Sequence, residues 1–236
     1  MIPSGPIARI AMITQQVRRV ITVDGVGASG KSALARLLAE RLGYTHLNSG
    51  LLYRAAGYLV SKSGVSPDDE EGIRAALKSH TIELRYDRAI GNQVIIDGVV
   101  CDNELQTQEI SRIASQVAKL TSVRDLFVDI QRRAFEPAGV VAEGRDMGTV
   151  IFPDAEPKFF VDADIKVRAE RRRLQLLAKG EDIDVSTIEN DLARRDYEDA
   201  HRAICPMKPA EDAVLIDNSK ASLEETVDKM PRLVTR

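Results

Sequence analysis

The hydrophobic pattern of the chain first becomes regular at residues 20–23, a short run of β-branched residues that predicts a buried strand. A glycine-rich segment follows directly, and leucines at helical i, i+3, i+4 and i+8 spacing come after it. These leucines are Leu34, Leu37, Leu38 and Leu42. Gly43 is a suitable residue to end this helix. A strand that leads through a glycine turn into a helix is the typical opening of a doubly wound α/β fold.

Strand and helix patterns continue along most of the chain. We expect further strands at 44–48, 139–144, 157–163 and 213–219. We expect helices at 49–64, 66–79, 104–120, 121–135, 164–180, 184–204 and 222–230. Ser49 is the expected N-cap of the first of these helices, and the Ser66-Pro67 pair is the expected start of the second. The sequence therefore predicts a parallel sheet of about five strands flanked by helices.

The pattern changes in the segment 79–105. Short β-rich pieces at 80–87, 92–98 and 99–102 are joined by turn residues, without helices between them. Such closely spaced strands indicate antiparallel hairpins, because a parallel connection needs a crossover of a dozen or more residues. We expect a small β-rich subdomain inserted into the α/β core.

Composition excludes several classes of protein. The chain has 236 residues, 29% of them charged, and a net charge of −3, which argues against a surface that coats nucleic acid. The two cysteines, Cys101 and Cys205, form no CxxC pair and suit a reducing cytosol, and the three histidines lack metal-ligand spacing. The sequence contains no run of 18 apolar residues, the length that a membrane-spanning helix would need. Residues 1–18 lack the apolar region of a secretory signal, and we expect a disordered tail there.

The glycine-rich segment 25–32 matches the phosphate-loop pattern G-x-x-x-x-G-K-[ST] between the predicted strand and helix. Its glycines let backbone N–H groups and the helix N-terminus surround a phosphate. Lys31 adds a charge at the β- and γ-phosphate oxygens, and the Ser32 hydroxyl is placed to bind Mg²⁺. The expected nucleotide-binding residues are Gly25, Val26, Gly27, Ala28, Ser29, Gly30, Lys31, Ser32 and Ala33. Many kinases and NTPases share this motif, so it does not name the reaction.

A surplus of arginines accompanies the phosphate loop. Transfer of a phosphoryl group between two anions needs several converging cations, and arginine binds two oxygens at once. The candidates are Arg54, Arg145, Arg195 and Arg202. Arg195 and Arg202 lie seven residues apart, which would place them on one helical face, and Asp199 is spaced to pair with Arg195. The run 171–173 is expected to include ordinary surface charges, because three adjacent residues cannot share one face.

Several segments together resemble bacterial cytidylate kinases. They are the phosphate loop, NSGLLYR at 48–54, ASQVAKLTSVRDL at 114–126, QRRAF at 131–135, AEGRDMGTVIFPDAEPKFFVDA at 142–163 and RRDYEDAHRA at 194–203. The resemblance extends from about residue 20 to the end, and GRDMGTVIFPDA is its most specific part. It implies a P-loop core at 19–78 and 120–236, an inserted CMP-binding subdomain at 79–119 and a mobile lid near 178–208.

The resemblance also implies a reaction: transfer of the γ-phosphoryl group of ATP to CMP or dCMP, with Mg²⁺, by a cytoplasmic monomer. It implies catalytic roles for Lys31, Arg145, Arg195 and Arg202. It implies substrate contacts from Ser49, Arg54, Ser115, Arg124, Arg145, Asp146, Arg195, Asp199 and Arg202. Within that set Ser115, Arg124 and Asp146 would read the cytosine, and Arg195 and Asp199 would contact the ribose. Ser32, and Glu143 through water, would hold the metal ion.

Other interpretations remain open from the sequence alone. The acceptor could be UMP or AMP, a shikimate-like kinase is a more distant alternative, and a non-catalytic nucleotide sensor would also carry a phosphate loop. Asp146 could instead cap a helix or pair with Arg145, and Ser115 could be an ordinary helix residue. The chain also departs from the family pattern at Asn48, Ala33 and Gln106, where relatives often carry Asp, Thr or Ser, and Arg.

Overall fold

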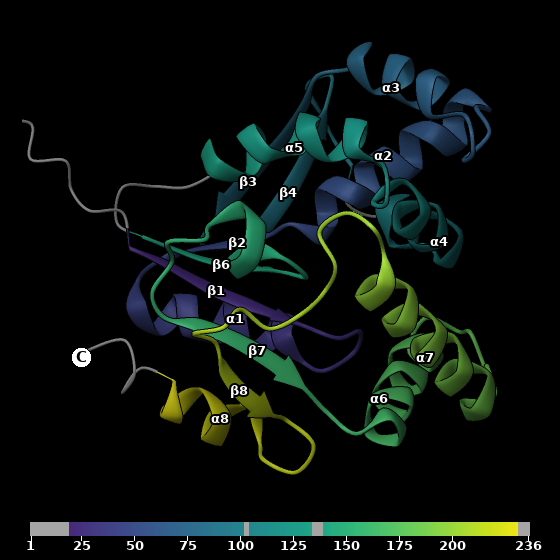
Figure 1. Ribbon diagram of the computed structural model, residues 1–236. Coiled ribbons are helices and arrows are strands. Elements are labelled where there is room, and N and C mark those ends of the chain that lie inside the picture. The colour runs from purple at the N-terminus through teal and green to yellow at the C-terminus, as the bar shows by residue number, and fades with distance from the viewer. Residues whose placement is uncertain (1–18, 102–103, 134–138, 231–236) are drawn as a thin grey trace, which may run out of the picture.

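The computed structural model describes residues 19–101, 104–133 and 139–230, and these contain two sheets (Figure 1). The larger sheet consists of β1 (Val20–Gly25), β2 (Thr45–Asn48), β6 (Val140–Gly144), β7 (Lys158–Asp162) and β8 (Val214–Asp217). Its strands are all parallel and lie in the order β2-β6-β1-β7-β8. The smaller sheet is antiparallel and consists of β3 (Ile82–Asp87), β4 (Gly91–Ile96) and β5 (Val99–Val100). Both the doubly wound sheet and the antiparallel insert were predicted from the sequence and are confirmed.

Eight α-helices surround these sheets in the described part of the chain. They are α1 (Lys31–Leu42), α2 (Gly50–Ser63), α3 (Glu70–Lys78), α4 (Gln108–Val117), α5 (Thr121–Arg133), α6 (Ile165–Leu177), α7 (Val185–His201) and α8 (Leu223–Lys229). A short 3₁₀ turn at Glu104–Gln106 and a π-helical turn at Met147–Ile151 complete the structure. None of these helices is long and apolar enough to cross a membrane.

The central strands β1 and β6 of the large sheet are buried on both faces, which is why they begin as continuous apolar runs, whereas β8 at the edge is largely exposed. Val141 packs with α1 and α8 on one face, whereas its neighbours Val140 and Ala142 pack with α2 and α5 on the other. This alternation follows from the two-residue period of a strand. The second cluster also takes in Leu84 and Val94 of the small sheet. The insert is therefore packed onto the core, and its boundaries at 79 and 119 stay a prediction.

The carboxyl ends of β1, β2 and β6 meet at one edge of the sheet because the strands are parallel and in register. Asp24 lies opposite Gly144, and Asn48 lies opposite Glu143. The loops that follow these strands are therefore neighbours. Gly25 ends β1 with φ of +148°, and a Cβ there would lie 2.0 Å from the carbonyl oxygen of Val161. A side chain has no room there, so this first loop residue must be glycine.

Most predicted helix ends lie within three residues of the observed ends. The helix expected from residue 104 starts instead at Gln108, because Thr107 caps it and Glu104–Gln106 form a 3₁₀ turn. Two further details differ. Gly43 ends α1 in the left-handed conformation, as expected. Ser49 does occupy the N-cap position of α2, but its hydroxyl donates to the backbone oxygen of Glu143 at 2.7 Å and caps nothing. The expected start of α3 at Ser66 is wrong. The Ser66 hydroxyl accepts from the N–H of Asp68 in a turn, and the Asp69 carboxylate caps the helix.

Helices α2 and α4 pack closely at Gly57, where a Cβ would lie 2.9 Å from the backbone nitrogen of Ala114 and from the oxygen of Ile110. We expect Gly57→Ala to lower the free energy of unfolding by about 1–2 kcal/mol, because overpacking outweighs the gain in helix propensity. Denaturant unfolding measures this change. Lys62→Ala, at the exposed end of the same helix, is the matched control and should change it by less than about 0.5 kcal/mol. A stabilised Gly57→Ala protein would contradict the close packing.

Candidate active site

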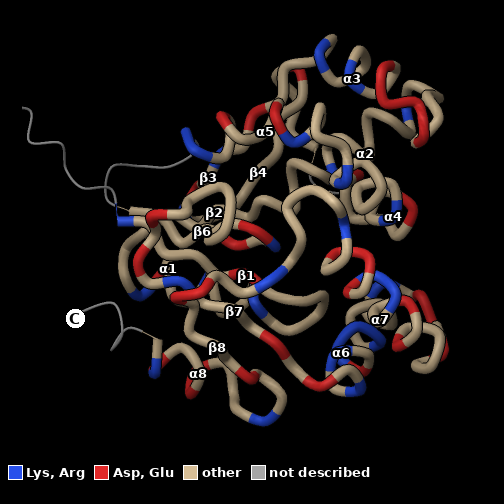
Figure 2. Tube along the Cα trace, in the orientation of Figure 1, with Lys and Arg blue, Asp and Glu red and all other residues tan. Residues whose placement is uncertain are grey.

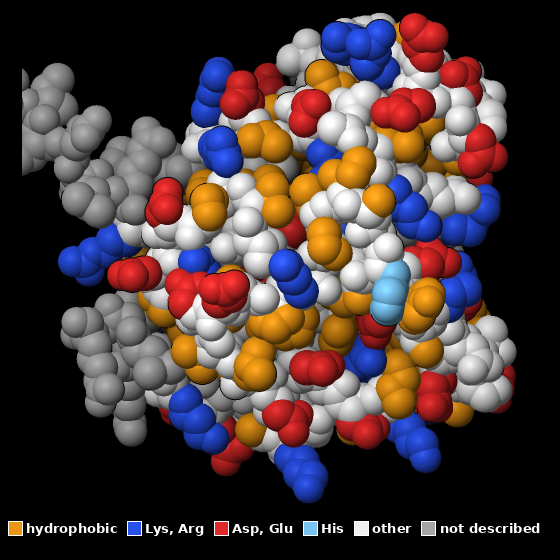
Figure 3. Space-filling model, in the orientation of Figure 1, with side chains coloured by type: hydrophobic (Ala, Val, Ile, Leu, Met, Phe, Trp, Pro, Cys, Tyr) orange, Lys and Arg blue, Asp and Glu red, His pale blue; other side chains and the backbone are white. Residues whose placement is uncertain are grey.

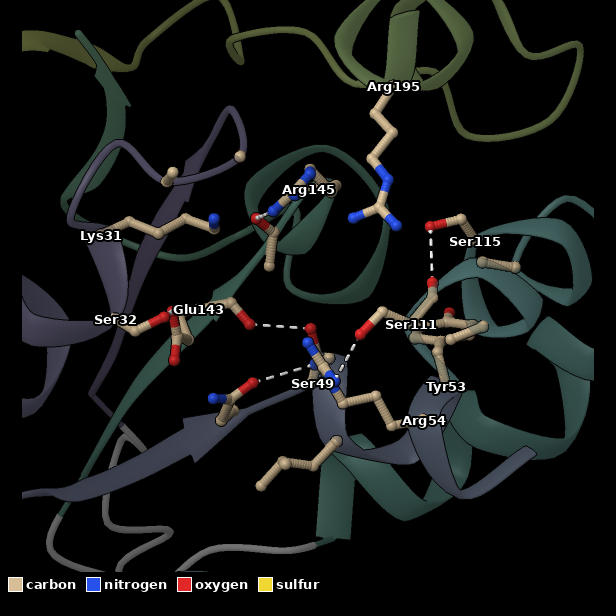
Figure 4. Close-up of a pocket in the computed structure, with 18 of the residues that line it drawn as sticks. Lys31, Ser32, Ser49, Tyr53, Arg54, Ser111, Ser115, Glu143, Arg145 and Arg195 are labelled. Atoms are coloured by element: carbon tan, nitrogen blue, oxygen red, sulfur yellow. Dashed lines mark hydrogen bonds between the residues drawn. The ribbon is translucent and has the colours of Figure 1, made fainter. Parts of the chain in front are cut away.

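One cavity of about 1040 Å³ lies at the carboxyl edge of the large sheet, between the phosphate loop, the small sheet, α4 and the helices α6 and α7 (Figure 4). Nine of the described residues that line it are cationic: Lys31, Arg36, Arg54, Arg124, Arg145, Arg171, Arg172, Arg195 and Arg202. Four are carboxylates: Glu143, Asp146, Asp196 and Asp199. The cavity therefore carries excess positive charge, and Figure 4 shows Lys31, Arg145 and Arg195 extending into it from three different elements.

Two side chains of the phosphate loop donate to one backbone oxygen of the same loop, that of Val26. The Lys31 ammonium donates to the oxygen of Val26 at 3.0 Å, and the Ser29 hydroxyl donates to the same oxygen at 3.1 Å. Burial, followed by the charge of Arg145, lowers the pKa of Lys31 to about 7. A phosphate group in this loop would supply the negative charge that favours the protonated amine. The phosphate-binding role of Lys31 stays a prediction, which these surroundings support.

Asp196 is a residue of the site that the sequence analysis missed. Its carboxylate accepts from the Gly27 N–H at 3.2 Å and from the Arg168 guanidinium at 2.5 Å. A residue of α7 therefore contacts the phosphate loop directly. Nothing in the local sequence signals this, because Arg168 and Gly27 lie 28 and 169 positions away from Asp196 along the chain.

The Glu143 carboxylate lies buried at the end of β6, 1% exposed, and both oxygens have partners. Ser32 donates to one oxygen at 2.6 Å, and the other lies 3.2 Å from Nε2 of His46. Burial raises the pKa of Glu143, but the hydrogen bond from His46, the charge of Lys31 and the hydrogen bond from Ser32 outweigh it and lower the pKa overall. Glu143 is therefore ionised, and this carboxylate with the Ser32 hydroxyl makes a hard oxygen donor set that fits Mg²⁺. No cluster of three or more acidic, histidine or cysteine side chains among the described residues could hold a metal alone.

The acceptor side of the cavity is built on α2 and α4. Arg54 on α2 donates to the Ser111 hydroxyl at 2.7 Å and to the oxygen of Leu105 at 2.9 Å. Ser115 follows one turn later on α4 and donates to the oxygen of Ser111 at 3.1 Å. Burial lowers the pKa of the Arg54 guanidinium, and the charges of Arg172 and Arg195 lower it further. Both predicted residues, Arg54 and Ser115, therefore lie in the same wall.

Asp146 lies at the start of the π-helical turn with its side chain buried, 2% exposed. It forms an ion pair with the Arg124 guanidinium, and Arg202 approaches the same carboxylate oxygen at 3.7 Å. Tyr53 of α2 lies below Arg124, with 5.6 Å between the guanidinium carbon and the ring centroid. Asp146 neither caps a helix nor pairs with Arg145, so both alternative interpretations of this residue are wrong.

The expected pair between Asp199 and Arg195 is also wrong. Asp199 instead accepts from Nε of Arg145 at 3.0 Å, which connects α7 to the loop after β6. Arg195 forms no hydrogen bond or ion pair with the described residues and extends into the cavity (Figure 4). Arg202 lies just beyond α7 in an extended conformation, so it does not share a helical face with Arg195. Both arginines nevertheless line the cavity.

The basic run on α6 contains both cavity residues and surface residues. Arg171 donates to the oxygens of Ser29 and Asn218 at 3.3 and 2.7 Å, and it lines the cavity together with Arg172. Arg173 pairs with Glu170 on the surface, as expected for such a run. Figure 2 shows the charged residues along α6 and α7. On the molecular face in Figure 3, acidic and basic side chains are mixed.

The positions that depart from the family pattern all line this cavity. Asn48 accepts from the Gly50 N–H at 3.1 Å and so fixes the start of α2. Gln106 accepts from the Lys179 ammonium at 3.2 Å, which joins the 3₁₀ turn to the segment after α6. Ala33 provides no hydroxyl in the first turn of α1. These residues keep the local structure without the charge or hydroxyl that relatives often carry.

Comparison with known proteins agrees with this geometry. The sequence model of the family described as cytidylate kinase matches residues 21–236. A cytidylate kinase from Pseudomonas aeruginosa (strain LESB58) is 40% identical over 216 residues, which cover 90% of this chain and 93% of that protein. One from Thermotoga neapolitana is 41% identical over 215 residues, covering 91% and 96%, and one from a Geobacillus species (strain WCH70) is 39% identical over 214 residues, covering 91% and 95%. The resemblance found in the sequence is confirmed, and the chain belongs to the cytidylate kinase family.

Proposed function

We propose that this protein transfers the γ-phosphoryl group of ATP to CMP and dCMP. The observation that carries this proposal is the single cavity that joins a phosphate loop to a wall with paired acidic and basic groups, Asp146 and Arg124. A phosphate loop provides for the donor nucleotide. The second wall provides for an acceptor that is itself an anion with a polar base, and membership of the family supports CMP as that acceptor.

The base-reading role of this wall follows from hydrogen-bond chemistry. Cytosine offers an amino donor at N4 beside acceptors at N3 and O2. The Asp146 carboxylate accepts from N4, whereas Arg124 and Ser115 donate to N3 and O2. Uracil would present a carbonyl oxygen to Asp146, and an unpaired buried polar group costs roughly 1–3 kcal/mol. The site therefore prefers cytosine without fully excluding uracil.

The transfer is a direct in-line displacement without a covalent enzyme intermediate. The acceptor phosphate is already ionised at neutral pH, so no dedicated general base is required. Lys31, Arg145, Arg195 and Arg202 neutralise charge that spreads over the transferred oxygens, and positioning supplies the remaining rate enhancement. Ser32 and Glu143 would hold Mg²⁺ with the nucleotide, and this ion would offset the charge on the β- and γ-phosphates.

The segment 178–208 acts as the lid in this proposal. Contacts already connect it to the acceptor side: Lys119 with Glu198 at 3.0 Å, and Gln108 with Glu181 at 3.2 Å. These two pairs are exposed and each contributes little, so they oppose opening of the segment only weakly. Closure would exclude water from the cavity and suppress hydrolysis of ATP.

A coupled assay of ADP formation with CMP, dCMP, UMP and AMP tests the proposed reaction. We expect CMP and dCMP to be the best acceptors and UMP to have a kcat/KM about ten- to a hundredfold lower. Lys31→Ala should remove nearly all turnover, because the charge at the β- and γ-phosphates is lost. ATP binding without transfer to any acceptor would instead favour a nucleotide sensor.

Asp146→Asn should narrow the ratio of kcat/KM for CMP to that for UMP, because an amide can rotate to donate to O4 of uracil. Steady-state kinetics with both acceptors measures the ratio. Asp125→Asn makes the same chemical change at an exposed neighbour of Arg124 and should leave the ratio unchanged. A ratio that stays at the wild-type value in Asp146→Asn would mean that this carboxylate does not read the base.

Binding of ATP should take up close to one proton at pH 8. The pKa of Lys31 is about 7 in the free protein, so the amine is mostly neutral at pH 8, and the phosphates favour its charged form. At pH 6 the amine is already charged, and this uptake should vanish. Calorimetry in buffers of different ionisation enthalpy counts the protons. Lys31→Arg keeps the charge without titrating, so persistent uptake in that variant would assign it to another group.

A further inference from the structure

We propose that His46 and Asn92 are positioning residues that hold the Glu143 carboxylate beside the phosphate loop, so that the inserted sheet sets the geometry of the transfer site. The inference rests on the proposed function for its kinetic consequences, whereas its structural content stands without it. None of the motifs that led to the family contains either residue. His46 lies on β2 and Asn92 lies on β4 of the insert.

Four hydrogen bonds form a continuous chain from the insert to the phosphate loop. The Asn48 N–H donates to Oδ1 of Asn92 at 3.2 Å, and Nδ2 of Asn92 lies 3.1 Å from Nδ1 of His46. Nε2 of His46 lies 3.2 Å from Oε1 of Glu143. The Ser32 hydroxyl then donates to Oε2 of the same carboxylate at 2.6 Å. The chain connects β4, β2, β6 and α1.

The donors and acceptors in this series of hydrogen bonds can be arranged in only one way. A backbone N–H can only donate, so the atom of Asn92 that faces Asn48 is the amide oxygen, and its NH₂ group faces His46. An NH₂ group also only donates, so Nδ1 of His46 must be the acceptor without a proton. The proton of the neutral ring is then on Nε2, where it is donated to Glu143. Asn92 thus fixes the tautomer that presents a donor to the carboxylate.

Glu143 needs such a constraint because its side chain is long and both of its oxygens are buried. His46 is 5% exposed and Glu143 is 1% exposed, so water offers little substitute for a lost partner. A second contact holds the hairpin in place, because the Arg88 guanidinium donates to the oxygen of Gly43 at 3.2 Å. Residues that orient a metal-binding side chain typically affect metal affinity or activity about 10- to 100-fold.

Asn92→Asp is the sharpest test, because it keeps the shape of the side chain and removes its donor. A carboxylate beside Nδ1 of His46 favours a proton on that nitrogen, which leaves an acceptor facing Glu143 or creates a charged ring. Long-range ¹H–¹⁵N correlation spectra of the ligand-free protein identify the protonated nitrogen, and His46→Gln assigns the signal. We expect the Nε2–H tautomer in the wild type and its loss in Asn92→Asp. A wild-type spectrum with Nδ1 protonated would overturn the proposal.

The kinetic test uses the full-length protein with CMP. We expect Asn92→Asp to lower kcat at least tenfold and to raise the Mg²⁺ concentration for half-maximal rate, with the KM for CMP changed less than about twofold. Gln93→Glu makes the same amide-to-carboxylate change on the opposite face of β4 and should retain wild-type rates. Unchanged kcat and Mg²⁺ dependence in Asn92→Asp would contradict the positioning role.

Asn92→Leu removes both hydrogen bonds without adding charge and guards against a folding defect in the first variant. The proposal requires a lower kcat in fully folded protein. Circular dichroism on the same samples measures the folded fraction. Rates that fall only in proportion to unfolded protein in both variants would overturn it. The spectra also distinguish a failure of the proposed function from a failure of the tautomer assignment. If the wild type phosphorylates no nucleotide, the proposed function fails while the tautomer and its response to Asn92→Asp remain measurable.

Discussion

The structure depends on an imbalance of charge at one place. Nine cationic side chains and four carboxylates of the described residues line a single cavity, in a chain whose net charge is −3. Holding like charges together in a partly buried space is unfavourable, and burial together with neighbouring cations lowers the pKa of Lys31 and of Arg54. The arrangement becomes favourable when anions enter, so the cavity is built for ligands that carry several negative charges.

The carboxylates of the cavity neutralise part of this positive charge through ion pairs. Asp146 pairs with Arg124, Asp199 with Arg145 and Asp196 with Arg168. Two of these pairs connect α7 with residues outside it, so the charges of the site also hold α7 near the phosphate loop. Nucleotide phosphates would compete for the same guanidinium groups. Under the proposed function, nucleotide binding and the position of α7 would be linked through these shared ion pairs.

The sequence predicted what depends on local order along the chain. Strand and helix positions follow from apolar periodicity, and the phosphate loop follows from eight contiguous residues. The start of α3 was misplaced because Ser66 and Asp69 both offer capping groups, and the choice depends on the turn between them. The surplus of arginines indicated Arg54 and the family resemblance added Ser115, and the structure brings both into one wall.

What the sequence could not predict are pairings between distant residues. The Asp199 carboxylate is spaced for Arg195 on the helix, but Arg145 from the end of β6 lies closer in space. Likewise Asp196 and His46 acquire their partners only when α7 and the insert fold against the core. The structure describes neither residues 1–18 nor 231–236, so the expected N-terminal tail lies outside the described residues.

The departure from the family pattern at Asn48 of β2 is best understood together with Glu143 of β6. Asn48 and Glu143 lie opposite each other in neighbouring strands, and two carboxylates at such a position would repel. An amide at position 48 leaves Glu143 as the one negative charge of this pair. The longer glutamate side chain then reaches Ser32 on one side and His46 on the other. The amide at Asn48 thus avoids a second negative charge beside Glu143, whose carboxylate stays ionised and oriented at the phosphate loop.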